Sequence, residues 1–298
     1  MALHYEGIRK GYPRLRRRFG KIVGYVQLVR PFTLLAPLFA GIFGVLTPVK
    51  DFTFSNFGTA IYVGVTLALA QAAGQCLNQY ADVELDKIIK PYRVLPSGIL
   101  TREEALGLAW ILAGFAIARA FTLSTFFGLI TLLLIFFAVF YSLPPFSPRR
   151  INPVLNTAWM AVSRGFLPMF AVWSIYGSVG AALPYAVLAF LWVFGFQASK
   201  DVPDIEGDKM FGIKTIPNTY GRKGLLAVMA VSTVLFAVTA VIFKVYIMLP
   251  LVFLAAFAIV TVQKQSALTE NTYSWLAFYL GLALLYVLLF LGSRFSLL

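Results

Sequence analysis

The apolar and polar positions of this chain fall into long blocks, with extended apolar segments separated by short polar ones. A helix needs about 20 apolar residues to cross roughly 30 Å of hydrocarbon. Segments suited to that length lie at about 31–47, 57–80, 104–121, 124–142, 153–176, 181–199, 223–243, 246–263 and 273–292. The pattern predicts an all-α, polytopic membrane protein with nine transmembrane helices. The alternating segments of about 10 residues that are typical of a membrane barrel are not evident.

Local signals predict where some of these helices begin. The sequence TREE, from Thr101 to Glu104, predicts a capping box at the start of the third span. Asn152 followed by Pro153 predicts the start of the fifth span, because proline is tolerated in a first helical turn. Prolines and glycines between positions 203 and 221 indicate an interrupted connection between spans six and seven.

The composition agrees with this class of protein. Sixty per cent of the residues are hydrophobic and 12% are charged, which is about half the charged fraction of soluble domains. We expect one integral-membrane domain over residues 1–298, with a basic segment at 1–30. The one cysteine, Cys76, rules out an internal disulfide and is expected to pack, since no base is adjacent. The one histidine, His4, argues against a His-rich zinc or haem site.

The distribution of Lys and Arg predicts the orientation. With the N-terminus inside, 4 of the 25 Lys and Arg residues lie on the outer side, Arg164 lies within a span, and the other 20 are cytoplasmic. Positively charged loops mark the cytoplasmic side. We therefore expect a cell-membrane protein with its N-terminus inside and its C-terminus outside. This topology explains most of the net charge of +13, so we expect no nucleic-acid partner. The basic stretch from Arg14 to Lys21 can rest on anionic lipid headgroups.

The acidic residues are concentrated in two short windows, both on the predicted cytoplasmic side. Seven of the 12 acids lie there: Asp82, Glu84 and Asp86 after the second span, and Asp201, Asp204, Glu206 and Asp208 after the sixth. Asn78, Asp82 and Asp86 are four residues apart, so they share one face if the second helix continues. Like charges one turn apart repel, and a bound cation would offset that repulsion. Oxygen ligands suit Mg²⁺, which commonly takes one or two carboxylates together with substrate phosphates.

Basic residues are interleaved with the acids in both windows. They are Lys87, Lys90 and Arg93 in the first window and Lys200, Lys209 and Lys214 in the second. Carboxylates that hold Mg²⁺ and bases that hold phosphate oxygens together suit a diphosphate. Solvated loops with surface ion pairs are the simpler explanation of one such window, but two windows with matching Asp spacing favour a site. Because the windows are four helices apart on the same side, they also suggest a parallel duplication around a shared cavity.

The same residues resemble a known family. NQYADVELD (Asn78 to Asp86) resembles the N-x-x-x-D-x-x-x-D signature of the UbiA superfamily of intramembrane prenyltransferases, and RVLPSG (Arg93 to Gly98) is similar to its R-P-L-P-S-G loop. KDVPDIEGD (Lys200 to Asp208), followed by GIKTIP (Gly212 to Pro217), resembles its second aspartate motif and G-x-x-T-L-P tail.

Two weaker segments and two departures complete the resemblance. LVRPFT (Leu28 to Thr33) resembles the family's entry to the first helix, and YSLPP (Tyr141 to Pro145) resembles its turn after the fourth. Gln79 stands where Asp often follows the Asn, and Val94 stands where Pro is usual. The resemblance implies nine helices around a cavity open to the lipid, and Mg²⁺-dependent transfer of a prenyl group from an isoprenyl diphosphate to a lipophilic acceptor.

The resemblance also implies roles for individual residues. Two Mg²⁺ ions, one for each motif, are expected to bridge the diphosphate. The expected ligands are Asp82, Asp86, Asp204 and Asp208, with Asn78 and Asp201 as further ligands or supporting groups. Lys90, Arg93 and Lys200 match motif positions and are expected to bind the diphosphate. Tyr141, in its YS context, is expected either to bond the diphosphate or to face the allylic cation, since aromatic faces stabilise cations.

Three further arginines are weaker candidates for the site, namely Arg30, Arg149 and Arg164. Arg164 lies in the middle of the fifth span, and an arginine at that depth usually faces a cavity and has a partner. We expect it to lie near an acceptor anion or an acid. The other interpretation is that it snorkels or forms a structural pair.

Other functions remain open at this point. The acceptor can be a quinone-precursor aromatic, chlorophyllide, haem, or a prenylglyceryl phosphate, as for a digeranylgeranylglyceryl phosphate synthase. CDP-alcohol phosphotransferases are also membrane proteins with Mg²⁺-binding aspartates, but their compact D-G-x-x-A-R…D-x-x-x-D motif does not occur here. A cation-coupled transporter would place acids in the middle of spans, whereas these acids lie at helix ends.

Overall fold

The computed structural model describes residues 20–264 and 272–295, and throughout these ranges the regular elements are helices. The first helical segment is Gly20–Val29. It is followed by α2 (Pro31–Leu46), α3 (Phe54–Ala81), α4 (Val83–Ile89), α5 (Arg102–Phe121), α6 (Thr125–Ser142), α7 (Pro148–Ile151), α8 (Pro153–Ala161), η1 (Val162–Phe166), α9 (Leu167–Tyr176), η2 (Val179–Ala182), α10 (Leu183–Phe196), η3 (Gln197–Asp204), α11 (Ile205–Met210), α12 (Ile216–Ile242), η4 (Tyr246–Met248), α13 (Leu251–Lys264) and α14 (Thr272–Arg294).

The helices confirm a multi-pass membrane protein. Within the described ranges, 8 helical stretches are long and apolar enough to span a membrane. A ninth span results if Gly20–Val29 and Pro31–Leu46, which meet at an angle of 51°, are one bent span. Arg30 lies at this bend in the left-handed region, with φ of 52°.

The predicted helix starts are confirmed by their caps. The Thr101 side chain accepts a hydrogen bond from the backbone of Glu104, whose carboxylate accepts one from the backbone of Thr101. The Asn152 side chain accepts hydrogen bonds from the backbone amides of Val154 and Leu155 at the start of α8.

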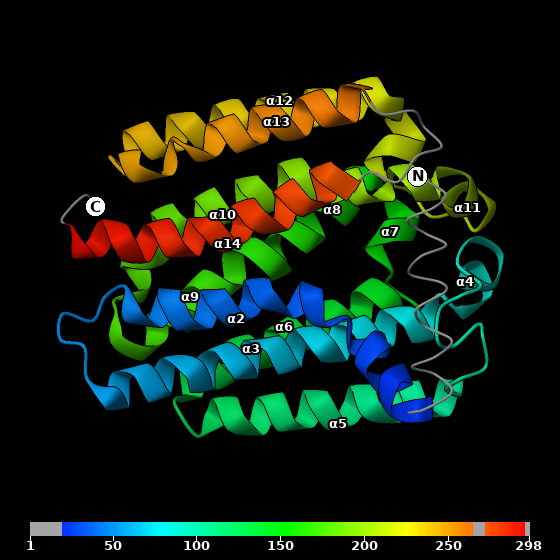
Figure 1. The fold of residues 1–298 in the computed structure, drawn as a ribbon, viewed down its shortest axis with the longest axis horizontal. Coiled ribbons are helices and arrows are strands. Elements are labelled where there is room, and N and C mark those ends of the chain that lie inside the picture. Colours follow the sequence, from blue (N-terminus) through cyan, green and yellow to red (C-terminus); the bar gives the residue numbers. More distant parts are fainter. Residues whose placement is uncertain (1–19, 265–271, 296–298) are drawn as a thin grey trace.

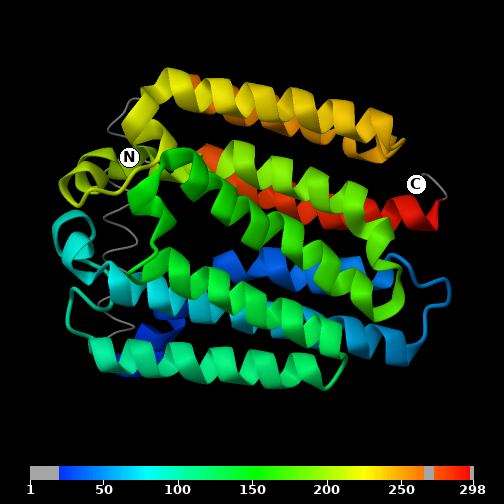
Figure 2. The same cartoon turned by 180° about the vertical axis from the view of Figure 1, so that it is seen from behind.

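The helices form a ring with an outer layer. Packing contacts close the ring from α2 to α3, α6, α9, α10 and α14, and back to α2. Helix α5 packs outside α3 and α6, and α12 and α13 form an outer pair beside α10 and α14 (Figures 1 and 2). The short helices α4, α7 and α11 gather at one end of the bundle (Figure 1). Cys76 is buried in a hydrophobic cluster near that end, which agrees with a packing role.

Two stretches differ from the predicted boundaries. The second acidic window is helical, because η3 and α11 continue the sixth span as far as Met210. Pro203 cannot donate the backbone bond that an α-helix requires, and the chain forms a 3-10 helix there instead. Helix α12 begins at Ile216 rather than at 223, with a kink at Gly221, where φ is 66°.

Candidate functional site

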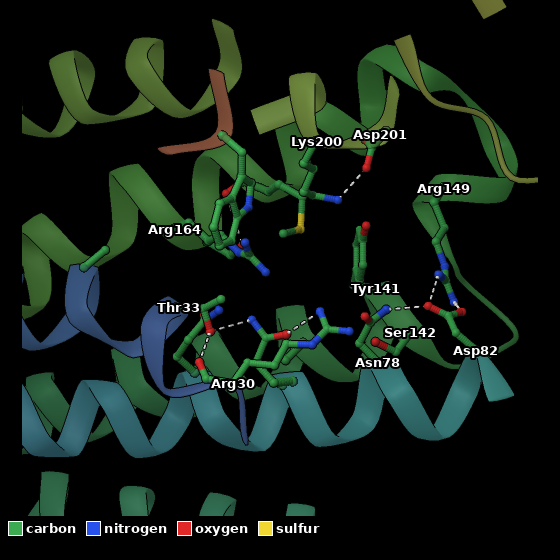
Figure 3. A pocket seen from close by; sticks show the side chains of 18 of the residues that line it. Arg30, Thr33, Asn78, Asp82, Tyr141, Ser142, Arg149, Arg164, Lys200 and Asp201 are labelled. Atoms are coloured by element: carbon green, nitrogen blue, oxygen red, sulfur yellow. Dashed lines mark hydrogen bonds and ion pairs between the residues drawn. The ribbon is translucent and has the colours of Figure 1, made fainter. Parts of the chain in front are cut away.

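A cavity of about 610 Å³ lies inside the ring of helices. Its wall comes from the ring helices α2, α3, α6, α9 and α14, from α8, η1 and η3, and from α4, α7 and α11 at one end of the bundle. All thirteen residues predicted for the site line this cavity, namely Arg30, Asn78, Asp82, Asp86, Lys90, Arg93, Tyr141, Arg149, Arg164, Lys200, Asp201, Asp204 and Asp208. Figure 3 shows ten of the residues at the polar part of the cavity by name.

The residues of the first acidic window keep a helical spacing although the helix is interrupted at Asp82, between α3 and α4. Asp82 lies between α3 and α4 with φ of −94° and ψ of 9°, a sparsely populated region of backbone conformation where many active-site residues lie. The backbone bonds from Asp82 to Asn78 and from Asp86 to Asp82 are both present. Asn78, Asp82 and Asp86 therefore remain neighbours on one face, and the Asn78 amide donates to the Asp82 carboxylate at 2.8 Å (Figure 3).

The second window reaches a similar arrangement by a different helix type. A 3-10 helix has three residues per turn, so Asp201 and Asp204 in η3 lie on one face. Asp204 then has φ of −98° and ψ of 2°, close to the values of Asp82. Helix α11 begins at the next residue and places Asp208 one α-helical turn further on.

The other acids of the windows point away from the cavity. Glu84 and Glu206 do not line it, and their side chains are 59% and 83% exposed. Each forms an ion pair with the lysine three residues later, Lys87 or Lys209. The two short helices thus carry matching outward faces and matching cavity faces.

These matches extend to the sequence itself. The segment DVELDK (Asp82 to Lys87) aligns with DIEGDK (Asp204 to Lys209), and a glutamine lies seven residues before each segment, Gln75 before Asp82 and Gln197 before Asp204. The alignment strengthens the suggested duplication. It was available from the sequence, but comparison of the aspartate spacing alone did not reveal it.

Four cavity aspartates are paired with basic side chains. Lys200 Nζ donates to Asp201 at 2.6 Å, and Arg93 Nη1 donates to both Asp86 oxygens at 2.6 and 2.5 Å. Two pairs join segments far apart in sequence. Arg149 donates to both Asp82 oxygens at 2.9 and 2.7 Å, and Lys90 of the first window bonds Asp204 of the second.

Close packing holds the two windows together. A Cβ atom at Gly207 in α11 would lie 2.5 Å from Ile89 Cγ2 and 3.3 Å from Leu85 Cδ1 in α4. Any side chain larger than glycine would therefore displace Ile89 or push α11 away from α4. The sequence offered no sign of this contact, because it depends on how two distant segments pack.

Burial perturbs two charged groups at this end of the cavity. Burial raises the pKa of Asp86, and the neighbouring guanidinium of Arg93 only partly opposes the rise. Burial and the charge of Arg93 lower the pKa of Lys90, against the opposing effect of Asp204. Burial thus disfavours both charged forms even though each side chain has an opposite charge in contact, and perturbed pKa values of this kind are common where charged ligands bind.

The carboxylate oxygens of the cavity suit a metal cation that also binds phosphate oxygens. Among the described residues, no three His, Cys, Asp or Glu side chains converge closely enough to hold a metal ion alone. Mg²⁺ typically binds through one or two carboxylates and completes its coordination with phosphate oxygens and water. Pairs of carboxylates facing a cavity that also carries Lys and Arg fit that requirement.

Two arginines of the cavity, Arg30 and Arg164, form hydrogen bonds with glutamines. Arg30 Nη1 donates to Gln75 at 3.2 Å, and Gln75 donates in turn to Thr33 at 3.1 Å. Arg164 Nη1 lies 3.4 Å from Gln197 Oε1. Neither glutamine was predicted from the sequence. Aromatic side chains of α14 complete this part of the wall, namely Trp275, Phe278, Tyr279 and Tyr286.

Comparisons with known proteins match most of the chain. The model of the UbiA prenyltransferase family matches residues 34–282. The digeranylgeranylglyceryl phosphate synthase of Thermococcus kodakarensis is 32% identical over 219 residues, which is 72% of this chain and 76% of the relative. The bacteriochlorophyll synthase 34 kDa chain of Chloroflexus aurantiacus is 30% identical over 236 residues, which is 76% of this chain and 73% of the relative.

Solved structures share the fold. A UbiA homologue from Archaeoglobus fulgidus bound to DMAPP and Mg²⁺ gives a TM-score of 0.69 at 20% identity, over 91% of this chain and 99% of that one. A digeranylgeranylglyceryl phosphate synthase gives a TM-score of 0.63 at 19% identity, over 93% of this chain and 98% of that one.

Proposed function

The chain belongs to the UbiA prenyltransferase family, and we propose that it uses Mg²⁺ to transfer a prenyl group from an isoprenyl diphosphate to a lipophilic acceptor. One observation carries the proposal. Two aspartate segments, 82–86 and 201–208, meet with four bases at one end of a single cavity in a membrane protein. Such a cavity can hold a charged diphosphate at that end and an apolar chain among the helices.

We assign the metal ligands to the cavity faces of the two windows. Asp82 and Asp86 would hold one Mg²⁺, and Asp204 and Asp208 would hold a second, with Asn78 and Asp201 as further ligands or supporting groups. When bound, Mg²⁺ supplies positive charge that stabilises the departing diphosphate. The A. fulgidus homologue bound to GPP and Mg²⁺ supports the use of this metal with this class of donor.

The basic side chains act on the same leaving group. Lys90, Arg93 and Lys200 donate hydrogen bonds to the diphosphate oxygens, on which negative charge builds as the allylic bond breaks. Arg149 joins them, because it lines the same cavity and approaches it from a different helix, α7. Each base would exchange its aspartate partner for a phosphate oxygen once that aspartate holds a metal ion.

Tyr141 is suited to either of its two expected roles. Its ring stands in the cavity between Lys200 and the Arg149–Asp82 pair (Figure 3). The Arg149 guanidinium lies 5.4 Å from the ring centre, so the ring already faces a cation. We propose that the hydroxyl donates to the diphosphate or that the ring stabilises the allylic cation.

Two versions of this function differ in the molecule that accepts the prenyl group. Several archaeal relatives are digeranylgeranylglyceryl phosphate synthases, which favours an ether-lipid precursor as acceptor. The bacteriochlorophyll synthase chain is about as similar to this chain, which favours a tetrapyrrole. Family membership makes a cation-coupled transporter the weaker alternative.

We also propose an orientation in the membrane. The excess of Lys and Arg favours a cytoplasmic position for the N-terminus and for the end of the bundle with α4, α7 and α11. Helix α14 then ends on the outer side. A diphosphate made in the cytoplasm could enter the site directly.

Prenyl transfer by purified protein tests the proposed function. With Mg²⁺ and radiolabelled geranylgeranyl diphosphate, we expect donor binding, and we expect EDTA to abolish it. Asp82→Ala and Asp204→Ala should each fold and lose transfer. Variants that fold and turn over normally would overturn the assignment of the aspartates. Cation flux into vesicles without product formation would favour a transporter.

A further inference from the structure

One basic residue of the second window has no role in the site described so far. Lys214 does not line the cavity, although its place in the window predicts a base that holds phosphate oxygens. Its Nζ donates to the backbone carbonyl of Ile151 at 3.1 Å, and its backbone amide donates to the carbonyl of Arg149 at 2.6 Å. Both contacts go to α7, the short helix that carries Arg149.

Helix α7 depends on contacts from outside for its position. It has four residues, Pro148–Ile151, and a single helical turn is unfavourable on its own. The last carbonyls of a helix have no partners within it. In α7, two of these carbonyls, those of Arg149 and Ile151, accept hydrogen bonds from Lys214. The backbone that carries the Arg149 side chain is therefore held by a residue of the second window.

A buried amide holds Lys214 in turn. Asn156 lies on α8 and is 4% exposed, and its Nδ2 donates to the Lys214 carbonyl at 3.1 Å. Its Oδ1 is buried without a hydrogen-bond partner among the described residues. A buried polar atom without a partner is costly, so stability alone does not favour an asparagine here. The contact to Lys214 is what this side chain provides.

The segment 213–215 is also tied to the second window. The amide of Ile213 donates to the backbone carbonyl of Asp208 at 2.8 Å. Contacts therefore run from Asp208 through this segment to Arg149, whose guanidinium bonds both Asp82 oxygens at 2.9 and 2.7 Å (Figure 3). This is a second connection between the two aspartate windows, beside the ion pair that joins them directly.

We propose that Asn156 and Lys214 are positioning residues that set Arg149 for binding of the donor diphosphate. A two-point bond from an arginine to an oxyanion has strict geometry, so a small displacement of α7 should weaken it. The Arg149 side chain is 7% exposed, which leaves it little room to compensate by changing its conformation. The inference rests on the proposed function, because it takes Arg149 as a donor-binding group.

Binding of geranylgeranyl diphosphate with Mg²⁺ tests the positioning role. Asn156→Leu removes the amide donor with little change in size and leaves the Lys214 carbonyl unpaired, so the donor Kd should rise about 10-fold. Lys214→Met removes the Nζ bond but keeps the backbone bond, and should raise the Kd about 3-fold. Lys214→Arg can still donate to Ile151 and should restore most of that loss.

A neighbouring cation provides the matched control. Arg150 lies on the same helix, is exposed and does not line the cavity. Arg150→Met therefore removes one positive charge from α7 without altering the contacts that hold it. The donor Kd of this variant should stay within about 2-fold of the wild-type value.

A double-mutant cycle shows whether Asn156 acts through Arg149. Substitutions that act through one group are not additive. In an Arg149→Met background, Asn156→Leu should change the donor Kd by less than about 2-fold. Inorganic diphosphate with Mg²⁺ should give the same pattern, because it has the charged group without the prenyl chain. Thermal unfolding of each variant without donor measures the loss of stability separately.

Two results would overturn the inference. Equal effects of Asn156→Leu with and without Arg149 would mean that the asparagine acts on stability or on another group. Normal donor affinity in folded Asn156→Leu and Lys214→Met would mean that α7 keeps its position without these contacts. If Asn156→Leu does not fold, Lys214→Met alters an exposed side chain and completes the same cycle. Wild-type protein that binds no donor is a different result, because it overturns the proposed function itself.

Discussion

The contact between α4 and α11 predicts a large effect from one added methyl group. In Gly207→Ala, the new Cβ would lie 2.5 Å from Ile89 Cγ2, whereas carbon atoms pack at about 3.5–4.0 Å. Either the Ile89 side chain or the two helices must therefore move by about 1 Å. Overpacking of this kind costs about 1–3 kcal/mol of stability. A shift of about 1 Å in a catalytic group can lower the rate about 100-fold, and α11 carries Asp208.

The measurement is kcat/KM with a labelled prenyl donor, together with thermal unfolding. We expect Gly207→Ala to lower kcat/KM by about 100-fold, and Ile89→Ala in the same chain to restore much of it by removing the obstructing methyl group. Gly107→Ala is the matched control, because nothing lies within 4 Å of its added Cβ. Normal activity of Gly207→Ala, or a further loss in the double variant, would refute the claim that close approach of the two windows is required.

Three other results are expected. Chelation of divalent cations should stop transfer, and added Mg²⁺ should restore it. Mg²⁺ binding measured with a donor analogue should give two ions per chain, and a single ion would leave one window without the metal assigned to it. Asp82→Asn should abolish transfer, whereas Glu84→Gln, which alters an outward carboxylate in the same segment, should leave kcat/KM nearly unchanged. Arg149→Lys keeps the charge but loses the two-point bond to Asp82, so donor affinity should fall about 10-fold; an unchanged Kd would place Arg149 outside the donor site.

The spans were predictable because their signals are local. A membrane span is specified by the length and hydrophobicity of one segment, and the caps at Thr101 and Asn152 depend on residues within one turn. The aspartate windows were predictable for a similar reason. A spacing of four residues places side chains on one face whatever the helix packs against.

The pairings across the site were not predictable in the same way. Arg149 and Asp82 are 67 residues apart, and Lys90 and Asp204 are 114 apart. Which base meets which acid depends on how the helices close into a ring, and no short pattern records that. The π-helical turn at Arg164 likewise depends on the packing of Gly165 against α10.

The two halves of the site repeat two aspartates, Asp82 and Asp86 in one and Asp204 and Asp208 in the other, but not their bases. In the alignment of the windows, Asn78 corresponds to Lys200 and Gln79 to Asp201, so an amide in one half stands where the other half carries a charge. Lys90 and Arg93 belong to the first half only, and Arg149 comes from α7, between the two. A prenyl diphosphate also has unequal ends, since one phosphate carries the chain and the other does not. A site with matching aspartates in its two halves can hold both phosphates of such a ligand. Because the Lys and Arg residues of the two halves do not match, the site can still favour one orientation, with the prenyl chain directed among the helices.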